Sequence, residues 1–205
     1  MAATSSPYGL RPLNLLGSQP AAGGTRLYKI PSAYATSIQF GDPVIITSSS
    51  TNRGQLARFS TTLTATTVTS SATIVGVFVG CTFTDSTYGP TFRQNYTGSI
   101  TASDIYAYVV DDPDALFQVQ ADGALSQTAL GCNAALIQTV AGSSGQNTIS
   151  GVSLQASSIN STSTLPLRIV DFVNAPGSAI GDAYTDVIVR INTHFHRTAT
   201  GTAAS

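Results

Sequence analysis

Residues 73–83, TIVGVFVGCTF, decide the fold class of this chain. The run is nearly continuous in apolar character and rich in β-branched residues, which predicts a central strand buried on both faces. On either side, other apolar stretches alternate with turns that contain Gly, Pro, Asn or Asp, as in a chain of strands. These stretches are RLYKI, PVIIT, QLARF, IYAYVV, ALFQVQA, LPLRIVDFV and TDVIVRINTHF. We therefore expect about eight to ten strands of ordinary length.

The composition favours the same fold class. Charged residues make up 9% of the 205 residues, with no Glu and a single Lys, Lys29. Because Glu and Lys favour exposed helix surfaces, neither a helical bundle nor a doubly wound α/β fold is expected. We expect an all-β protein with little helix, built as a β-sandwich or jelly-roll-like domain, with a β-tulip barrel as the alternative. Only residues 125–140, rich in Ala, Leu and Gln, allow a short helix.

The N-terminal segment, residues 1–25, has a different pattern. Pro and Gly interrupt any regular element, yet large apolar side chains are too frequent for a solvated tail. We expect an extended irregular arm over 1–25 and a β-rich domain over 26–205, with two smaller β-modules as the alternative, divided near the Ser/Thr-rich stretch or around residue 100. The arm is expected either to reach a neighbouring subunit or to pack on its own sheet. If it reaches a neighbour, deleting residues 2–16 should leave the β-domain folded.

Motifs for catalysis or cofactor binding are scarce. The chain has no GxGxxG, GxxxxGK[ST], GxSxG or HExxH sequence. His194 and His196 would share one face of a strand and could reach one metal, but a third ligand is missing nearby, which favours an ordinary polar strand end. We interpret residues 111–114, DDPD, as the turn of a hairpin rather than a calcium site. No catalytic residue, metal or cofactor is expected, and the protein is not expected to be an enzyme.

Charge and targeting features narrow the class of partner. The net charge is −1, whereas nucleic acids and anionic membranes require a basic surface, so neither is an expected partner. The sequence has no signal-peptide pattern and no apolar run of about 20 residues, which predicts a protein made and kept inside a cell at first. A surface with so few charges is poorly protected against association. We therefore expect assembly with other protein subunits.

The sequence also resembles a known family. SSPYGLRPLNLLGS is similar to the PFGLRP-type start of head-associated structural proteins of tailed bacteriophages. GDPVIIT followed by IVGVFVGCTFTD is similar to the GDPV…GVFVG pattern of phage capsid cement, or head-decoration, proteins. AYVVDDPDALFQVQADG and LPLRIVDFV…GSAIGDAYTDVIVRIN look like the remainder of the same family. The resemblance spans most of the chain and is carried by several short motifs.

The resemblance implies a virion structural protein, synthesised in the host cytoplasm, that binds the outer surface of an icosahedral head and stabilises it against the pressure of packaged DNA. Its partners would be the major capsid protein and further copies of itself, as a homotrimer. The candidate contacts to the shell all lie in the arm: Tyr8, Leu10, Arg11, Leu13, Leu15 and Leu16. The alternatives are a head–tail connector, tail or fibre-base protein and, less favoured because Trp is absent, a carbohydrate-binding adhesion module.

Overall fold

A computed structural model describes residues 4–15, 24–48, 51–59, 73–138, 148–173, 175 and 178–197 of the chain. The strands are β1 (Arg11–Leu15), β2 (Thr25–Lys29), β3 (Pro43–Ile46), β4 (Leu56–Arg58), β5 (Gly76–Asp85), β6 (Gly89–Arg93), β7 (Tyr106–Val110), β8 (Ala115–Gln120), β9 (Asn133–Ala134), β10 (Leu136–Gln138), β11 (Val152–Leu154), β12 (Leu167–Phe172) and β13 (Asp186–Ile191). Two 3-10 turns, η1 (Gln127–Ala129) and η2 (Ala156–Ser158), are the only helical elements of the described residues. The expected all-β character is confirmed. No helix in the described ranges is long and apolar enough to cross a membrane.

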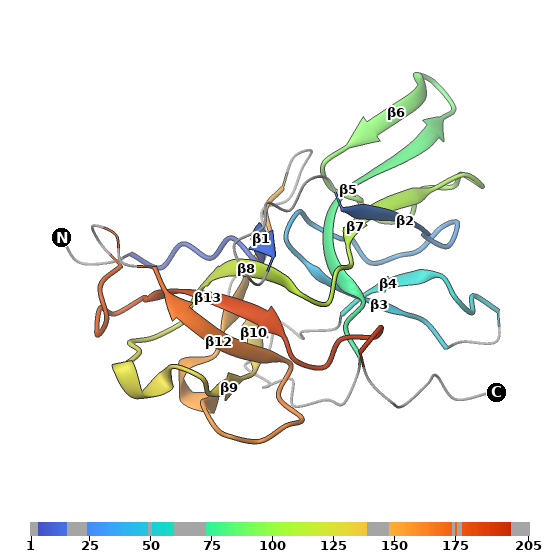
Figure 1. The fold of residues 1–205 in the computed structure, drawn as a ribbon. Coiled ribbons are helices and arrows are strands. Elements are labelled where there is room, and N and C mark those ends of the chain that lie inside the picture. The colour runs from blue at the N-terminus through green and yellow to red at the C-terminus, as the bar shows by residue number, and fades with distance from the viewer. Residues whose placement is uncertain are drawn as a thin grey trace.

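The strands form two main antiparallel sheets, which lie in two lobes (Figure 1). The five-strand lobe contains the sheet β1-β8-β13-β12-β9 together with the small β10–β11 pair. The six-strand lobe contains the sheet β2-β7-β5-β3-β4, with β6 added to β5. Because β2 to β7 follow β1 and precede β8, the six-strand lobe is an insertion into the five-strand lobe.

The architecture is sandwich-like, as the composition predicted. Within the described ranges, each sheet order has two free ends, so neither sheet closes into the alternative tulip barrel. In the five-strand lobe, alternate residues of β8 and β13, including Phe117 and Val189, are completely buried on one face. Leu136 and Leu154 of the β10–β11 pair cover that face. Burial of each such side chain contributes about 1.5–3 kcal/mol to stability.

Strand β5 has the double burial that its sequence predicts. Val77 and Phe78 are neighbours and point to opposite faces, yet both are completely buried. Val77 packs in the core of the five-strand lobe, whereas Phe78 packs in the core of the six-strand lobe. The most apolar strand of the sequence therefore belongs to both cores and joins the two lobes.

Two local expectations need correction. Residues 111–114 do not close a hairpin, because β7 pairs with β2 and β5 whereas β8 pairs with β1 and β13. The turn instead carries the chain from one lobe to the other, near the division expected around residue 100. The other expected division, in the Ser/Thr-rich stretch, lies largely outside the described residues. The second correction concerns residues 125–140, where the sequence allowed a short helix. The described part of this stretch, residues 125–138, forms only one 3-10 turn and two short strands.

The last two long strands pair with each other. Strands β12 and β13 are antiparallel neighbours, with Leu167 opposite Ile191. The register shifts between Ile169 and Asp171, which marks a bulge in β12. The pair lies in the middle of the five-strand sheet, between β8 and β9.

Candidate interaction surface

The N-terminal segment packs on its own chain. The Gly9 N–H donates to the Val152 carbonyl at 3.2 Å, and the Leu10 N–H donates to the Gly41 carbonyl at 2.9 Å, so the segment touches both lobes. Gly9 has a φ of +72°, and a Cβ there would lie 2.5 Å from Cβ of Ser150. Only glycine fits that position, because the backbone is left-handed and the space is filled. The PYGLRP motif thus has a structural role at the junction of the lobes.

The structure separates the arm residues that were expected to contact a shell. Leu10 is completely buried in the core of the five-strand lobe, so it is withdrawn as a surface contact. Leu15 is partly buried against the same core, and Leu16 lies outside the described residues. Arg11 and Leu13 are exposed, on the edge strand β1. Over residues 4–15 the irregular arm is therefore corrected to a packed segment that ends in strand β1, which matches the alternative of packing on its own sheet, and deletion of residues 2–16 is now expected to damage the fold.

Tyr8 is half-buried and held by two partners. Its hydroxyl donates to Oδ1 of Asp186 at 3.0 Å, and the Arg11 guanidinium lies 4.8 Å from the centre of its ring. Burial, together with the Asp186 carboxylate, raises the pKa of Tyr8 above its ordinary range. Tyr8 therefore stays protonated and acts as a hydrogen-bond donor that fixes the segment to β13.

A second surface, which the sequence analysis did not single out, lies on the outer face of the six-strand sheet. Leu27 of β2 is opposite Tyr108 of β7. Tyr106 of β7 is opposite Thr82 of β5, which is itself opposite Phe92 of β6. Opposite residues of an antiparallel pair share a face, so these side chains lie together across four strands. We name the set Leu27, Phe92, Tyr106 and Tyr108 the aromatic face.

The aromatic face is open to solvent. Leu27 is 54% exposed, Phe92 63% and Tyr106 41%. The rings of Phe92 and Tyr108 meet edge to face with their centres 5.9 Å apart. Gly80 makes room for this contact, since a Cβ there would lie 2.8 Å from Cζ of Phe92. Exposed apolar groups that gather on one face are typical of protein interaction sites.

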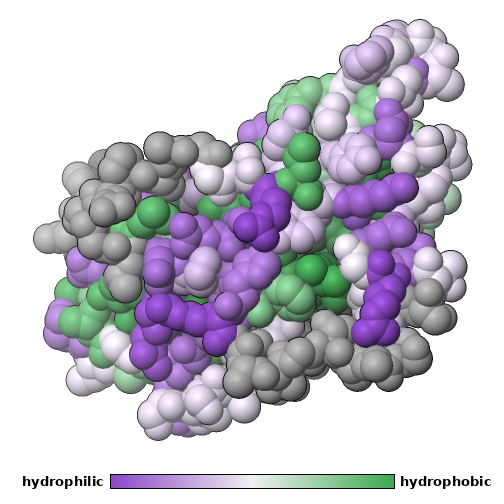
Figure 2. All heavy atoms as spheres, turned by 45° about the vertical axis from the view of Figure 1, so that its right-hand side comes forward, coloured by the Kyte–Doolittle hydropathy of each residue, from purple (hydrophilic) through white to green (hydrophobic). Residues whose placement is uncertain are grey.

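The β5–β6 hairpin extends the aromatic face away from the body of the molecule (Figure 1). Its projecting end carries residues of mostly intermediate hydropathy, drawn pale in Figure 2. Tyr88, in the turn, is 81% exposed. The Asp85 carboxylate fixes that turn by accepting the N–H groups of Thr87 and Tyr88 at 2.8 and 3.2 Å, and these bonds lower the pKa of Asp85. The turn therefore presents Tyr88 on an ordered support.

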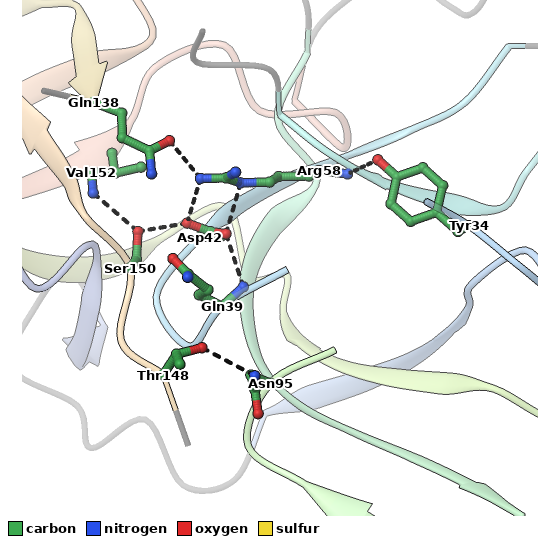
Figure 3. Close-up of polar contacts among 9 residues, drawn as sticks. All are labelled: Tyr34, Gln39, Asp42, Arg58, Asn95, Gln138, Thr148, Ser150 and Val152. Atoms are coloured by element: carbon green, nitrogen blue, oxygen red, sulfur yellow. Dashed lines mark hydrogen bonds and ion pairs between the residues drawn. The ribbon is translucent and has the colours of Figure 1, made fainter. Parts of the chain in front are cut away.

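A buried polar cluster joins the lobes close to the N-terminal segment (Figure 3). The completely buried Asp42 lies 2.8 Å from Nε of Arg58 and accepts the Ser150 hydroxyl at 2.5 Å. The Gln39 N–H donates to the same carboxylate, and Arg58 donates to the Gln138 side chain. Burial raises the pKa of Asp42, while Arg58 and these donors oppose the rise. This Asp42 junction is a structural tie between the lobes.

A second polar cluster, more exposed, surrounds Asp111. Its Oδ2 accepts the Tyr28 hydroxyl at 2.8 Å and lies 3.2 Å from Nε of Arg26 and 3.3 Å from Nε2 of His196. The cluster borders an open cleft of about 440 Å³. Burial, followed by the bond to Asp111, raises the pKa of Tyr28 to about 12, so its hydroxyl remains a donor.

The two histidines do not form a shared metal site. His194 is completely buried, and its Nδ1 accepts the N–H of His196 at 3.2 Å, whereas Nε2 of His196 lies beside Asp111. The described part of the chain holds no group of three His, Cys, Asp or Glu side chains placed to bind a metal ion. The arrangement instead ties the end of the described chain to the two lobes.

Comparison of the chain with protein-family models, with curated protein sequences and with solved structures finds no match in any of the three.

Proposed function

We propose that this protein is a virion structural protein, a capsid cement or decoration protein that binds the outer surface of an icosahedral phage head. The observation that carries the proposal is the aromatic face on the six-strand sheet. It gathers three large exposed apolar side chains, Leu27, Phe92 and Tyr106, on one sheet. Binding energy at protein interfaces concentrates in a few such residues, Tyr prominent among them.

The chemistry around the aromatic face fits a protein partner. Lys29 of β2, opposite Tyr106, adds one positive charge at the rim, where it can meet a carboxylate of the capsid protein. Apolar residues at the centre and few charges at the edge form the usual anatomy of a protein interface. The family resemblance of the motifs supports the head as the place of binding.

Stabilisation of a shell needs only binding to the assembled lattice. A protein that binds the assembled state alone stabilises each site by about 4 kcal/mol when its free concentration is a thousand times the dissociation constant. A trimer that engages three shell sites would also dissociate far more slowly than a single copy. In this proposal the N-terminal segment stabilises the fold, whereas the aromatic face and Tyr88 contact the capsid.

Co-sedimentation with emptied heads tests the proposal. The wild-type protein should pellet with the heads and saturate at a copy number close to that of the major capsid protein. Phe92→Ser should weaken binding at least tenfold, whereas Ile180→Ser, which changes a 47% exposed residue of the other lobe, should not. Saturation at a few copies per particle would favour the connector or tail alternative, and binding to immobilised glycans without head binding would favour the adhesion module.

The solution mass tests the expected trimer. Light scattering should give about 63 kDa, three times the chain mass of 21.1 kDa. A mass of one chain at the working concentration would remove the homotrimer from the proposal.

A further inference from the structure

The segment that follows β13, residues 193–197, links the two lobes, and we name it the C-terminal clasp. The Ile74 N–H donates to the Thr193 carbonyl at 3.0 Å, and the Phe195 N–H donates back to the Ile74 carbonyl at 2.8 Å. Ile74 lies two residues before β5, and Phe195 packs against the core of the six-strand lobe. The clasp thus continues β13, a strand of the five-strand lobe, onto the six-strand lobe.

His194 lies at the centre of the clasp and is completely buried. Its Nδ1 accepts the backbone N–H of His196 at 3.2 Å. A nitrogen that accepts a hydrogen bond carries a lone pair, so the ring is neutral and its proton is on Nε2. That Nε2 is buried and has no hydrogen-bond partner among the described residues.

We propose that His194 makes the C-terminal clasp acid-labile, so that a proton taken up at Nδ1 releases residues 193–197 from the six-strand lobe. The incoming proton can bind only Nδ1, because Nε2 already carries one. The protonated Nδ1 becomes a donor that faces the His196 N–H, so that hydrogen bond is lost. The imidazolium would also be buried without an acceptor on Nε2, which the closed clasp disfavours strongly.

The charged groups around His194 act in both directions. His196, whose ring centre is 5.5 Å away, and Arg197 oppose a charge on His194, whereas Asp111 and Asp112 favour it. Asp111 is already engaged by Arg26, and Asp114 by Arg197 at 3.0 Å.

The direction and size of the pH effect on clasp closure follow from the linkage between closure and proton binding at His194. Burial, more than any neighbouring charge, lowers the pKa of His194 to about 4 from an ordinary 6.5. The open clasp therefore binds the proton more tightly, and closure is lost as the pH falls from 6.5 towards 4. Between pH 7 and pH 4.5 the closing equilibrium should fall roughly 50-fold.

Hydrogen–deuterium exchange of the full chain tests the proposal on the peptide that covers residues 192–197. After correction for intrinsic rates, wild-type protection should fall at least tenfold between pH 7 and pH 4.5. His194→Gln keeps an acceptor for the His196 N–H but cannot take up a proton, so its protection should change less than twofold. His196→Gln, the matched control, should respond to acid like the wild type. An equal loss of protection in His194→Gln would overturn the proposal.

A second measurement does not depend on the folding of the His194→Gln chain. The imidazole Cε1–H resonances of the wild type can be followed by NMR from pH 8 to pH 3.5, with His196→Gln used for assignment. The His194 resonance should titrate near pH 4, together with new exchange broadening in the clasp. Titration near pH 6.5 with unchanged clasp resonances would contradict the proposal. Neither experiment depends on the proposed capsid binding.

Discussion

Asp42 and His194 are both completely buried where the two lobes meet, but their surroundings differ. Asp42 has a counter-ion, Arg58, and accepts hydrogen bonds from a backbone N–H and from the Ser150 hydroxyl. His194 accepts one bond and leaves its Nε2 unpaired among the described residues. A buried polar group with all its partners resists change, whereas one with a missing partner responds to protonation. The Asp42 junction is therefore a constant tie, and the C-terminal clasp is a conditional one.

The largest expected effect comes from breaking the Asp42 junction. Arg58→Ala would leave the Asp42 carboxylate buried without its counter-ion, and we expect the free energy of unfolding to fall by about 3–5 kcal/mol. Arg197→Ala, which removes a half-exposed ion pair with Asp114, should cost about 0–1 kcal/mol. Urea unfolding of both variants measures the contrast. Equal losses would mean that the buried pair does not hold the lobes.

The N-terminal segment beside the Asp42 junction should be nearly as sensitive. Leu10→Ala removes a completely buried side chain and is expected to lower the free energy of unfolding by about 2–5 kcal/mol. Leu13→Ala, only three residues away but 40% exposed, should change it by less than about 0.5 kcal/mol. Thermal unfolding checks both variants. A harmless Leu10→Ala would instead favour the other alternative from the sequence, an arm that reaches a neighbouring subunit.

Acid should weaken the C-terminal clasp. As the pH falls from 7 to 4.5, the unfolded chain takes up a proton on His194 before the folded chain does, because burial lowers the folded pKa to about 4. The wild type should therefore lose about 2 kcal/mol more than His194→Gln over that range. Urea unfolding at both pH values measures the difference. Parallel curves for the two proteins would assign the acid response to other groups.

The smallest effect on stability is expected on the aromatic face. Phe92 is 63% exposed, so Phe92→Ser should alter the free energy of unfolding by no more than about 0.5–1 kcal/mol, the larger value allowing for the ring contact with Tyr108. The same substitution should weaken head binding at least tenfold. A fold that fails without Phe92 would place the residue among the structural ones and leave the docking proposal to Leu27 and Tyr88.

The strands were largely predictable from the sequence, but their partners were not. The apolar run around Val77 and Phe78 predicted burial on both faces, because burial depends on side-chain type. Residues 111–114 resembled a hairpin turn, and only the pairing of β7 and β8 with distant strands excluded it. Pairing over long distances depends on the packing of the whole chain, which local patterns do not contain.

The candidate site was harder to predict. The PYGLRP motif drew attention to Leu10, yet an apolar residue near a chain end carries no mark of whether its own core or another subunit covers it. The alternation in IYAYVV carries a signal that could have placed Tyr106 and Tyr108 on one face of a strand. Their meeting with Phe92 depends on the bulge at Gly80, where the register between β5 and β7 shifts. Bulges of this kind leave little trace in sequence beyond an isolated glycine.

The insertion of one lobe into the other has a consequence for synthesis on the ribosome. The strands of the six-strand sheet lie within residues 25–110, so that sheet can form while later residues are still being translated. Strand β1 must wait for β8, and the Val77 face of β5 lacks its covering core until β8 to β13 have emerged. The nascent chain therefore exposes an apolar strand face for the time needed to translate about eighty residues, at about 5–20 residues per second. We therefore expect the growing chain to be most prone to aggregation during that interval.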